Sequence, residues 1–540
     1  MALSCARGLL RGAAMALVVA SGPAGARNDS VPSETPVPGL FQSRSDTGAG
    51  SVTVDGHRID YHSVAGTLVI HAADWDDTET AGKPAADATA SPEASIFYVA
   101  YFKDGAPSEN RPITFLYNGG PGSSTLWLHM GAFGPRRVAL AADGHTPAAP
   151  YAIVNNEHSL LDRSDLVFVD APGTGFSRIA GKDKEKAFLG IDADASAFSS
   201  FIKAFLTRYS RWNSPKYLFG ESYGTPRTAV LVNKLTTEDE IDFNGIVLLS
   251  QFLDLHLLAE WQGANPDSVV GYVTQLPTFA ATAWYHDLIP GGKPADLKAF
   301  LAQAEEFAAT DYAAALLRGS EIDPATRSRV AQKMAGFTGL PVDYILKANL
   351  RVDGPEFAKE LQQAHGLTTG RLDSRYSGPD LDPLSKSAEY YPDSAAFDSA
   401  YVSAFNAYVR EELHYRDAAQ FKPVTDILKN WDWNHPTGGY PALGWAGVNT
   451  MPDLAQAMKY NPHLKVMVAG GYYDLVTPYF QGWFEMHHLL IPDILRRNIE
   501  YHYYQSGHMV YVNPAAAAEL HADIGRFIDA SDNVPEHAAR

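Results

Sequence analysis

The stretch that decides the fold is Lys216-Tyr217-Leu218-Phe219-Gly220-Glu221-Ser222-Tyr223-Gly224, in which an apolar run leads into a G-x-S-x-G motif. In such a motif a strand turns sharply into a helix, and only small residues fit on either side of the serine. The turn presents the serine hydroxyl above the sheet, beside the N-terminus of the helix. Thr225-Pro226 follows, and proline suits the first turn of a helix. The stretch therefore predicts that Ser222 is a nucleophile on a strand-to-helix turn.

Apolar runs of strand length lie on both sides of this motif. They cover residues 113–117, 166–169, 243–250 and 465–469, and a further strand is expected at residues 499–504. Apolar residues also recur at three- and four-residue spacing in a segment that begins near Asp192, which predicts a helix that packs on the sheet. Strands that alternate with helices predict a mostly parallel central sheet.

The region before these runs predicts an antiparallel start to the sheet. Residues 52–61 alternate between apolar and polar side chains around Asp55-Gly56, a pair that is typical of a tight hairpin turn. Residues 67–72 and 96–102 are further strand candidates. Together with the serine turn, this order of elements predicts an α/β-hydrolase fold.

The composition changes after the last of the early strands. Across residues 251–430 Ala, Leu, Glu, Gln and Lys dominate, strand-like runs vanish and helical periodicity takes over. We interpret this region as a helical cap inserted into the fold. The predicted organisation is a signal peptide at residues 1–26, a flexible leader at 27–50, the first part of the core at 51–250, the mainly helical cap at 251–430 and the second part of the core at 431–540.

Residues 1–26 have the features of a secretory signal peptide. Two arginines make the start cationic, residues 13–20 are apolar, and Ala24-Gly25-Ala26 fits the A-x-A cleavage pattern. The apolar run is far shorter than the ~20 residues that span a bilayer. We therefore expect cleavage, a periplasmic or secreted product and no membrane contact afterwards. The only cysteine, Cys5, lies in this segment, and export without a disulfide favours a bacterial envelope.

Composition limits the function classes. Hydrophobic residues make up 46% of the chain and charged residues 19%, which is the balance of a soluble globular protein. The formal net charge of -19 argues against nucleic acid as a partner. The chain contains neither H-x-x-E nor H-E-x-x-H, the motifs of zinc peptidases, and we expect no metal and no cofactor. The oligomeric state stays open.

A serine hydroxyl needs a base within hydrogen-bonding reach, and the base needs a carboxylate that fixes its tautomer. In this fold the chain order is serine, acid, histidine. Asp474 follows the apolar strand at residues 465–469, and His508 follows the strand at residues 499–504. Sites of open α/β sheets gather beyond the carboxyl ends of the strands. We therefore predict Ser222, Asp474 and His508 as a catalytic triad.

A glycine-rich loop, Asn118-Gly119-Gly120-Pro121-Gly122-Ser123-Ser124, follows the early strand at residues 113–117. The fold places here the loop that contributes a backbone N–H to an oxyanion hole. Gly120 and Tyr223 are the two expected donors. A phosphate-binding loop is disfavoured because G-K-[ST] is absent.

At this point the sequence resembles the serine carboxypeptidase family, as a bacterial-type member. FLYNGGPGSS, DLVFVDAPGTGFS, GESYG, a strand that ends at Asp474 and SGHMV resemble the five motifs of the family in the right order. The resemblance implies that Asn118, Gly119 and Glu221 bind the C-terminal carboxylate of a peptide substrate. Glu221 must then be protonated, or share a proton with the substrate, because two ionised carboxylates repel each other.

The sequence departs from the family at three positions. Leu116 stands where relatives carry Trp, Ser123 where they carry Cys, and Ala132 where they carry a Glu that shares a proton with the acid before the nucleophile. We therefore expect a weaker dependence of activity on acid pH than in typical relatives.

Three function classes fit the same residues. The first is a serine-type carboxypeptidase that acts on peptides with a free C-terminal carboxylate. The second is an acyltransferase or esterase that uses the same triad. The third is a binding protein without activity, which predicts a damaged triad, whereas all three triad residues are present. We expect the carboxypeptidase.

Overall fold

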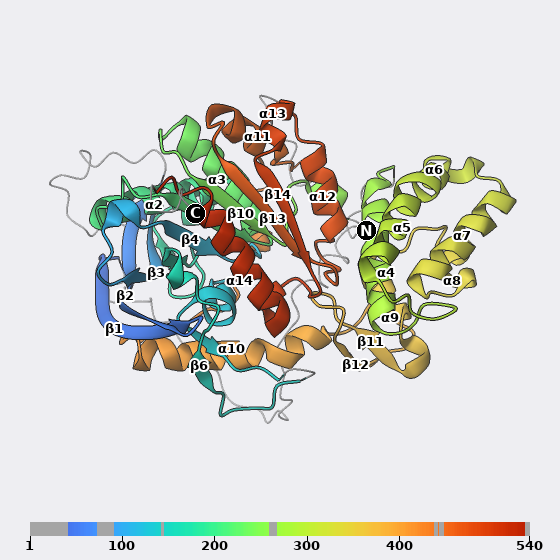
Figure 1. Ribbon diagram of the computed structural model, residues 1–540, viewed down its shortest axis with the longest axis horizontal. Coiled ribbons are helices and arrows are strands. Elements are labelled where there is room, and N and C mark those ends of the chain that lie inside the picture. Colours follow the sequence, from blue (N-terminus) through green and yellow to red (C-terminus); the bar gives the residue numbers. More distant parts are fainter. Residues whose placement is uncertain are drawn as a thin grey trace, which may run out of the picture.

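The computed structural model describes residues 41–72, 91–141, 145–258, 267–436, 441 and 448–534 of the 540 residues. The predicted signal peptide and most of the predicted leader lie outside the described residues. Figure 1 shows a core built around one large twisted sheet, with a group of helices beside it.

Ten strands form the central sheet. They are β1 (Arg44–Val54), β2 (His57–His71), β3 (Glu93–Lys103), β4 (Ile113–Tyr117), β7 (Asp165–Val169), β8 (Arg178–Ala180), β9 (Lys216–Glu221), β10 (Gly245–Leu249), β13 (Lys465–Gly471) and β14 (Ile499–Tyr504). The order is β1-β2-β3-β7-β4-β9-β10-β13-β14, and β8 pairs with β3. From β7 to β14 the neighbours are parallel, whereas β1, β2, β3 and β7 pair antiparallel. The predicted sheet, antiparallel at its start and mostly parallel after it, is confirmed.

The first two strands form the predicted hairpin, with Asp55 and Gly56 at φ +48° and +76° in the turn. The predicted end of the leader at residue 50 is wrong, because β1 already begins at Arg44 and pairs there with Thr67. The strand was not predicted because its first residues are small or polar and show no apolar periodicity. Backbone hydrogen bonds to β2 do not require apolar side chains, and Arg44 also forms an ion pair with Asp417.

Helices cover both faces of the sheet. On one face α2 (Ile191–Arg208), α3 (Gly224–Thr237) and α11 (Met451–Tyr460) share a hydrophobic core with alternate strand residues such as Ile246 and Leu248. On the other face, Val247 and Leu249 pack in a second core with α10 (Pro392–Glu411) and α14 (Pro514–Asp529). Successive strand residues point to opposite faces, so each strand serves both cores.

The cap has a hydrophobic core of its own, to which its helices and the loop after β13 contribute. Its elements are α4 (Val270–Tyr285), α5 (Leu297–Phe307), α6 (Ala313–Leu317), α7 (Pro324–Thr338), α8 (Val342–Lys347), α9 (Gly354–Glu360) and the strand pair β11 (Leu367–Thr369) and β12 (Ser377–Pro379). Helix α10 belongs to the same predicted segment but packs along the core (Figure 1). The remaining elements are α1 (Lys184–Phe188), α12 (Tyr479–His487), α13 (Asp493–Arg496), β5 (Arg136–Val138) and β6 (Ile153–Asn155).

Candidate active site

Ser222 lies where β9 ends and α3 begins, on the sharp turn that the motif predicts. Its φ of +59° falls in the left-handed region, which costs a residue other than glycine about 1–3 kcal/mol. Both flanking glycines are required. A Cβ on Gly220 would lie 2.1 Å from the carbonyl oxygen of Gly224, and one on Gly224 would lie 3.0 Å from that of Tyr117. The N–H of Ser222 donates to the carbonyl of Leu249 at 3.0 Å, which anchors the turn to β10.

Asp474 and His508 are in direct contact at the ends of β13 and β14. Nδ1 of His508 lies 2.6 Å from Oδ2 of the fully buried Asp474. The N–H groups of Val476 and Thr477 donate to Oδ1 at 2.9 and 3.0 Å, and the Thr477 hydroxyl donates to Oδ2 at 2.6 Å. The carboxylate thus makes Nδ1 of His508 the donor, which leaves Nε2 free to act as a base.

Ser222 and His508 are linked through the end of β10. Among the described residues, no hydrogen bond joins the Ser222 hydroxyl to His508, and before substrate binds such contacts are often long. Leu249 accepts the N–H of Ser222, and the hydroxyl of the next residue, Ser250, donates to the carbonyl of His508 at 2.6 Å. Two consecutive residues, Leu249 and Ser250, therefore hold two of the three predicted triad residues.

The glycine loop after β4 packs directly on the turn that carries Ser222. A Cβ on Gly119 would lie 2.3 Å from the backbone nitrogen of Tyr223, so only glycine permits this approach. Gly120 has a φ of +110°, which also favours glycine. Within the described parts of the chain, the N–H groups of Gly120 and Tyr223 have no acceptor. Unpaired backbone N–H groups are rare in folded proteins, so both are available to a ligand oxygen.

Glu221 is a buried carboxyl beside the nucleophile. Burial raises its pKa to about 7, against the charge of His508 and hydrogen bonds from Tyr511 and Asn118. The Tyr511 hydroxyl donates to Oε2 at 2.9 Å. Oδ1 of Asn118 accepts the N–H of Leu128 at 3.2 Å, which leaves its NH₂ group as the donor. Near neutral pH, Glu221 is therefore divided between the neutral and the ionised form.

Glu221 and His508 influence each other's protonation. Burial acts to lower the pKa of His508, but the charges of Asp474, Glu221 and Asp393 and the hydrogen bond to Asp474 outweigh it and raise the pKa. When Glu221 binds a proton, it no longer stabilises the His508 cation, so His508 releases its proton more easily. The two groups therefore titrate as a coupled pair.

A tyrosine stands beside Glu221 where relatives are expected to supply an acid. Ala132 is buried and cannot share a proton. Tyr511, three residues after His508, reaches Glu221 instead, and its ring packs against the segment that contains Ala132. A Cβ on Gly131 would lie 2.8 Å from the Tyr511 ring. Tyr511 directly follows the SGHMV motif, which places it near His508 but does not identify Glu221 as its partner.

Sequence reasoning also missed a buried ion pair behind the glycine loop. Arg227 on α3 donates to the carbonyl of Asn118 at 2.8 Å and pairs with Asp194 of α2 at 2.6 Å. Both side chains are buried. An arginine in the first turn of the helix that follows the G-x-S-x-G motif was the available signal. Thr477 was missed as well, although it lies only three residues after Asp474.

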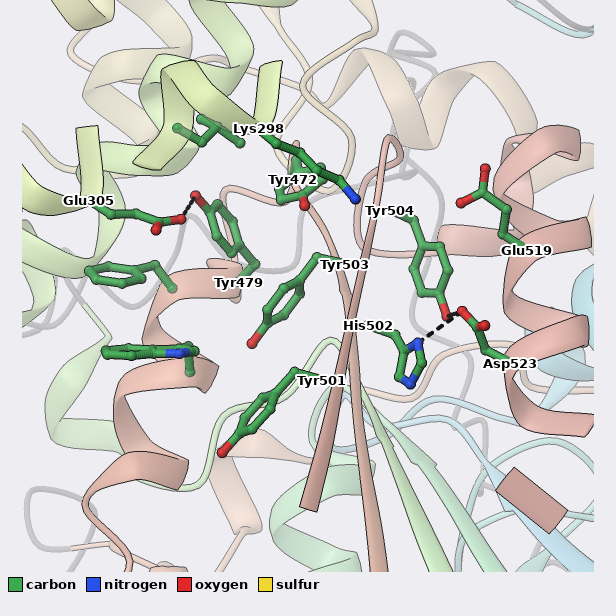
Figure 2. A pocket seen from close by; sticks show the side chains of 13 residues that line it. Lys298, Glu305, Tyr472, Tyr479, Tyr501, His502, Tyr503, Tyr504, Glu519 and Asp523 are labelled. Carbon is green, nitrogen blue, oxygen red and sulfur yellow. Dashed lines mark hydrogen bonds and ion pairs between the residues drawn. The ribbon is translucent and has the colours of Figure 1, made fainter. Parts of the chain in front are cut away.

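One pocket, between the cap and the core, does not include the predicted triad residues. It lies between α5 of the cap and α12, β14 and α14 of the core (Figure 2), and its volume is about 440 Å³. Tyrosines and carboxylates line it, and the hydroxyl of Tyr479 donates to Glu305 there. Ser222, Asp474 and His508 are not among its lining residues. The cavity is therefore not the cleft in which the predicted triad lies.

Comparisons with known proteins identify a family for this chain. The sequence profile of one family, described as serine carboxypeptidase (Peptidase_S10), matches residues 86–482, more than half of the chain. A carboxypeptidase Y homolog of Arthroderma benhamiae is 33% identical over 136 residues, which cover 25% of this chain and 24% of that protein. The serine carboxypeptidase ctsa-3.2 of Caenorhabditis elegans is 26% identical over 209 residues, covering 36% of this chain and 38% of that protein. The chain thus spans about a quarter to two fifths of the length of the curated relatives it matches.

A solved structure supports the fold. The crystal structure of Kex1(delta)p, a prohormone-processing carboxypeptidase from Saccharomyces cerevisiae, matches with a TM-score of 0.51. The match covers 87% of this chain and 91% of that chain at 17% identity. At this identity the likeness concerns the fold alone, and it confirms the predicted α/β-hydrolase fold.

Proposed function

The chain belongs to the serine carboxypeptidase family, and on that premise we propose that it releases C-terminal amino acids from peptides through an acyl-enzyme on Ser222. The observation that carries the proposal is the buried Glu221 next to the nucleophile, with a pKa that burial raises to about 7. Below that pH its neutral carboxyl can donate a hydrogen bond to a substrate carboxylate. An ionised, solvent-exposed glutamate would repel the same group.

In the proposed acylation step, Nε2 of His508 takes the proton of the Ser222 hydroxyl while the oxygen attacks the carbonyl carbon of the last peptide bond. Asp474 stabilises the resulting imidazolium through the 2.6 Å contact at Nδ1. The carbonyl oxygen becomes an oxyanion and accepts the free N–H groups of Gly120 and Tyr223, a pair of contacts of which each is typically worth ~10²–10³ in rate.

The intermediate then collapses. His508 gives its proton to the leaving amine, and the C-terminal amino acid departs. In the second half, His508 activates a water molecule that attacks the acyl group, and the carboxylic acid product leaves Ser222 free. His508 thus serves as base and as acid in turn.

Recognition of the C-terminus follows from the polar group beside Ser222. The NH₂ group of Asn118 and the neutral carboxyl of Glu221 are the proposed donors to the substrate carboxylate. Gly119 allows the glycine loop to pack closely on the turn that carries Ser222. An amidated terminus is a poorer acceptor and would leave these buried groups badly matched, which costs affinity.

The test compares kcat/KM for a blocked dipeptide, the same peptide amidated, and a sugar ester, from acid to mildly alkaline pH. We expect the free acid to be preferred, with the preference lost as pH rises through about 7, where Glu221 ionises. Equal rates on acid and amide at every pH would contradict carboxylate recognition. A faster reaction with the ester would favour the esterase or acyltransferase alternative.

We also propose that the protein acts in the periplasm or outside the cell after its signal peptide is cleaved. The support is the signal-like pattern at residues 1–26, which lie outside the described residues. Within the part of the chain that the structure describes, no helix is both long and apolar enough to cross a membrane. Mass spectrometry of the protein from the exporting cell would locate the N-terminus, which we expect near Arg27.

A further inference from the structure

A turn of the cap reaches between the two loops that carry Asp474 and His508. The turn joins β11 to β12, and its residues bond to both loops. Its hydrogen bonds run from Leu475 N–H to Arg371 O at 3.1 Å, from His508 N–H to Leu372 O at 2.6 Å, and from both the N–H and the hydroxyl of Ser374 to Tyr473 O at 2.9 Å. The loop of the acid and the loop of the base are thereby tied to one short segment of a different part of the chain.

Close packing reinforces these bonds. A Cβ on Gly507, which precedes His508, would lie 2.5 Å from Cβ of Asp373, so the histidine loop lies directly on the turn. Asp373 is buried and pairs with Arg375, which in turn donates to the hydroxyl of Ser506 at 3.2 Å. The histidine loop is therefore held by the turn over Ser506, Gly507 and His508 in succession.

Asp393, near the N-terminus of α10, binds the turn between β11 and β12 through the backbone of Asp373. It is fully buried, and its Oδ2 accepts the N–H of Asp373 at 2.9 Å. Its Oδ1 has no hydrogen-bond partner among the described residues. A buried carboxylate oxygen without a partner is costly, so the position is not explained by the stability of α10 alone.

We propose that Asp393 and residues 371–375 form a clamp that sets the position of His508 relative to Asp474. Asp393 is a positioning residue, because it acts through the backbone of Asp373 and Leu372 and not on substrate. The inference rests on the proposed function, since it concerns the same triad. A misplacement of about 1 Å at a reacting group can cost ~10²-fold in rate, so a clamp of this kind has a measurable effect.

Two substitutions separate position from charge. Asp393→Ala removes the acceptor of the Asp373 N–H, and we expect kcat to fall by about 10- to 100-fold with little change in KM. Asp393→Asn keeps an acceptor oxygen but removes the charge, so kcat should fall much less.

The asparagine variant should instead change the pH profile. Three carboxylates, Asp474, Glu221 and Asp393, act on His508 and favour its cation. Loss of one of them lowers the pKa of His508, so the base becomes neutral at lower pH. The rising limb of kcat should therefore move toward acid in Asp393→Asn. This shift should be seen above about pH 6, where Asp393 is ionised in the wild type.

The matched control is Asp323→Ala. Asp323 also lies in the cap and also accepts a backbone N–H, that of Thr326 at 2.9 Å, but it caps α7 on the far side of the cap (Figure 1). The control should keep the kcat and pH profile of the wild type. If folded Asp393→Ala matches this control in kcat, the clamp is refuted.

Two readouts keep the test decisive. Should Asp393→Ala fail to fold, Asp393→Leu takes its place, because leucine is close in volume and also offers no acceptor to the Asp373 N–H; a wild-type kcat in that variant refutes the clamp. The rate of labelling by an organophosphonate reads the activation of Ser222 without any peptide. A wild type that labels but releases no amino acids would overturn the proposed carboxypeptidase, while slower labelling in Asp393→Ala would still support the clamp.

Discussion

Replacing Tyr511 with phenylalanine should extend the recognition of free C-termini to higher pH. Burial raises the pKa of Glu221 to about 7, and the hydrogen bond from Tyr511 opposes that rise by stabilising the ionised form. A hydrogen bond to a charged group contributes ~1.5–3 kcal/mol, and part of it persists to the neutral form. Since 1.4 kcal/mol corresponds to about one pKa unit, its loss should raise the pKa of Glu221 by about one unit.

The sign of the effect follows from which form binds. The neutral carboxyl of Glu221 donates a hydrogen bond to the substrate carboxylate, so kcat/KM for a free-acid peptide falls as pH rises through the pKa of Glu221. In Tyr511→Phe that fall should occur about one pH unit higher for the free-acid peptide. The amidated peptide does not need the neutral carboxyl, so its profile should show only the smaller change that the coupling of Glu221 to His508 produces. The assay is kcat/KM against pH for both peptides.

A matched control is Tyr217→Phe. Tyr217 is also a buried tyrosine, but its hydroxyl bonds to Ser531 at 2.9 Å, far along β9 from Glu221. Tyr217→Phe should leave unchanged the pH at which kcat/KM for the free-acid peptide falls. The role given to Glu221 would be refuted if the fall of kcat/KM occurred at the same pH in Tyr511→Phe as in the wild type. It would also be refuted if the fall moved equally for the free-acid and the amidated peptide.

Three further predictions concern single contacts. Glu221→Gln should flatten the falling limb for free-acid peptides, because an amide donates at any pH; a limb as steep as in the wild type would contradict this. Thr477→Val removes one of the hydrogen bonds to Asp474 and should lower kcat by about 10-fold, whereas Thr477→Ser should retain most of it. His435 lies between two aspartates, and although burial opposes it, their hydrogen bonds and charges raise its pKa from 6.5 to about 9. Because a raised histidine pKa stabilises the fold below the unfolded value, the stability advantage of the wild type over His435→Gln should be full below about pH 6.5 and vanish as pH rises through about 9, as measured by urea unfolding. A gap that grows with pH would contradict it.

Local sequence patterns were sufficient for the parts of the site that one segment builds. The strand-to-helix turn at Ser222 needs only an apolar strand and two glycines, and these stand together in the sequence. Asp474 and His508 could be placed from the chain order of the fold, because each follows a strand that the sequence predicts. The left-handed φ of Ser222 and the close approach of Gly119 are consequences of the same motifs.

Contacts between distant segments could not be predicted in this way. The partner of Glu221 is Tyr511, 290 residues further along the chain, and periodicity carries no information on such a pair. The clamp on His508 comes from the cap, which composition describes only as helical. The early start of β1 was missed for a related reason, since its pairing with β2 relies on backbone hydrogen bonds that no side-chain pattern reveals.

The central claim is that Ser222 is the nucleophile, activated by His508 and Asp474. The most direct test is to treat the wild type, Ser222→Ala and Asp474→Ala with a peptidyl organophosphonate and to locate the adduct by mass spectrometry of the digested protein. We predict a single adduct on Ser222 in the wild type, none in Ser222→Ala, and labelling slower by orders of magnitude in Asp474→Ala, because a misoriented histidine is a poor base. Undiminished labelling of Ser222→Ala, or an adduct on another residue of the wild type, would contradict the account.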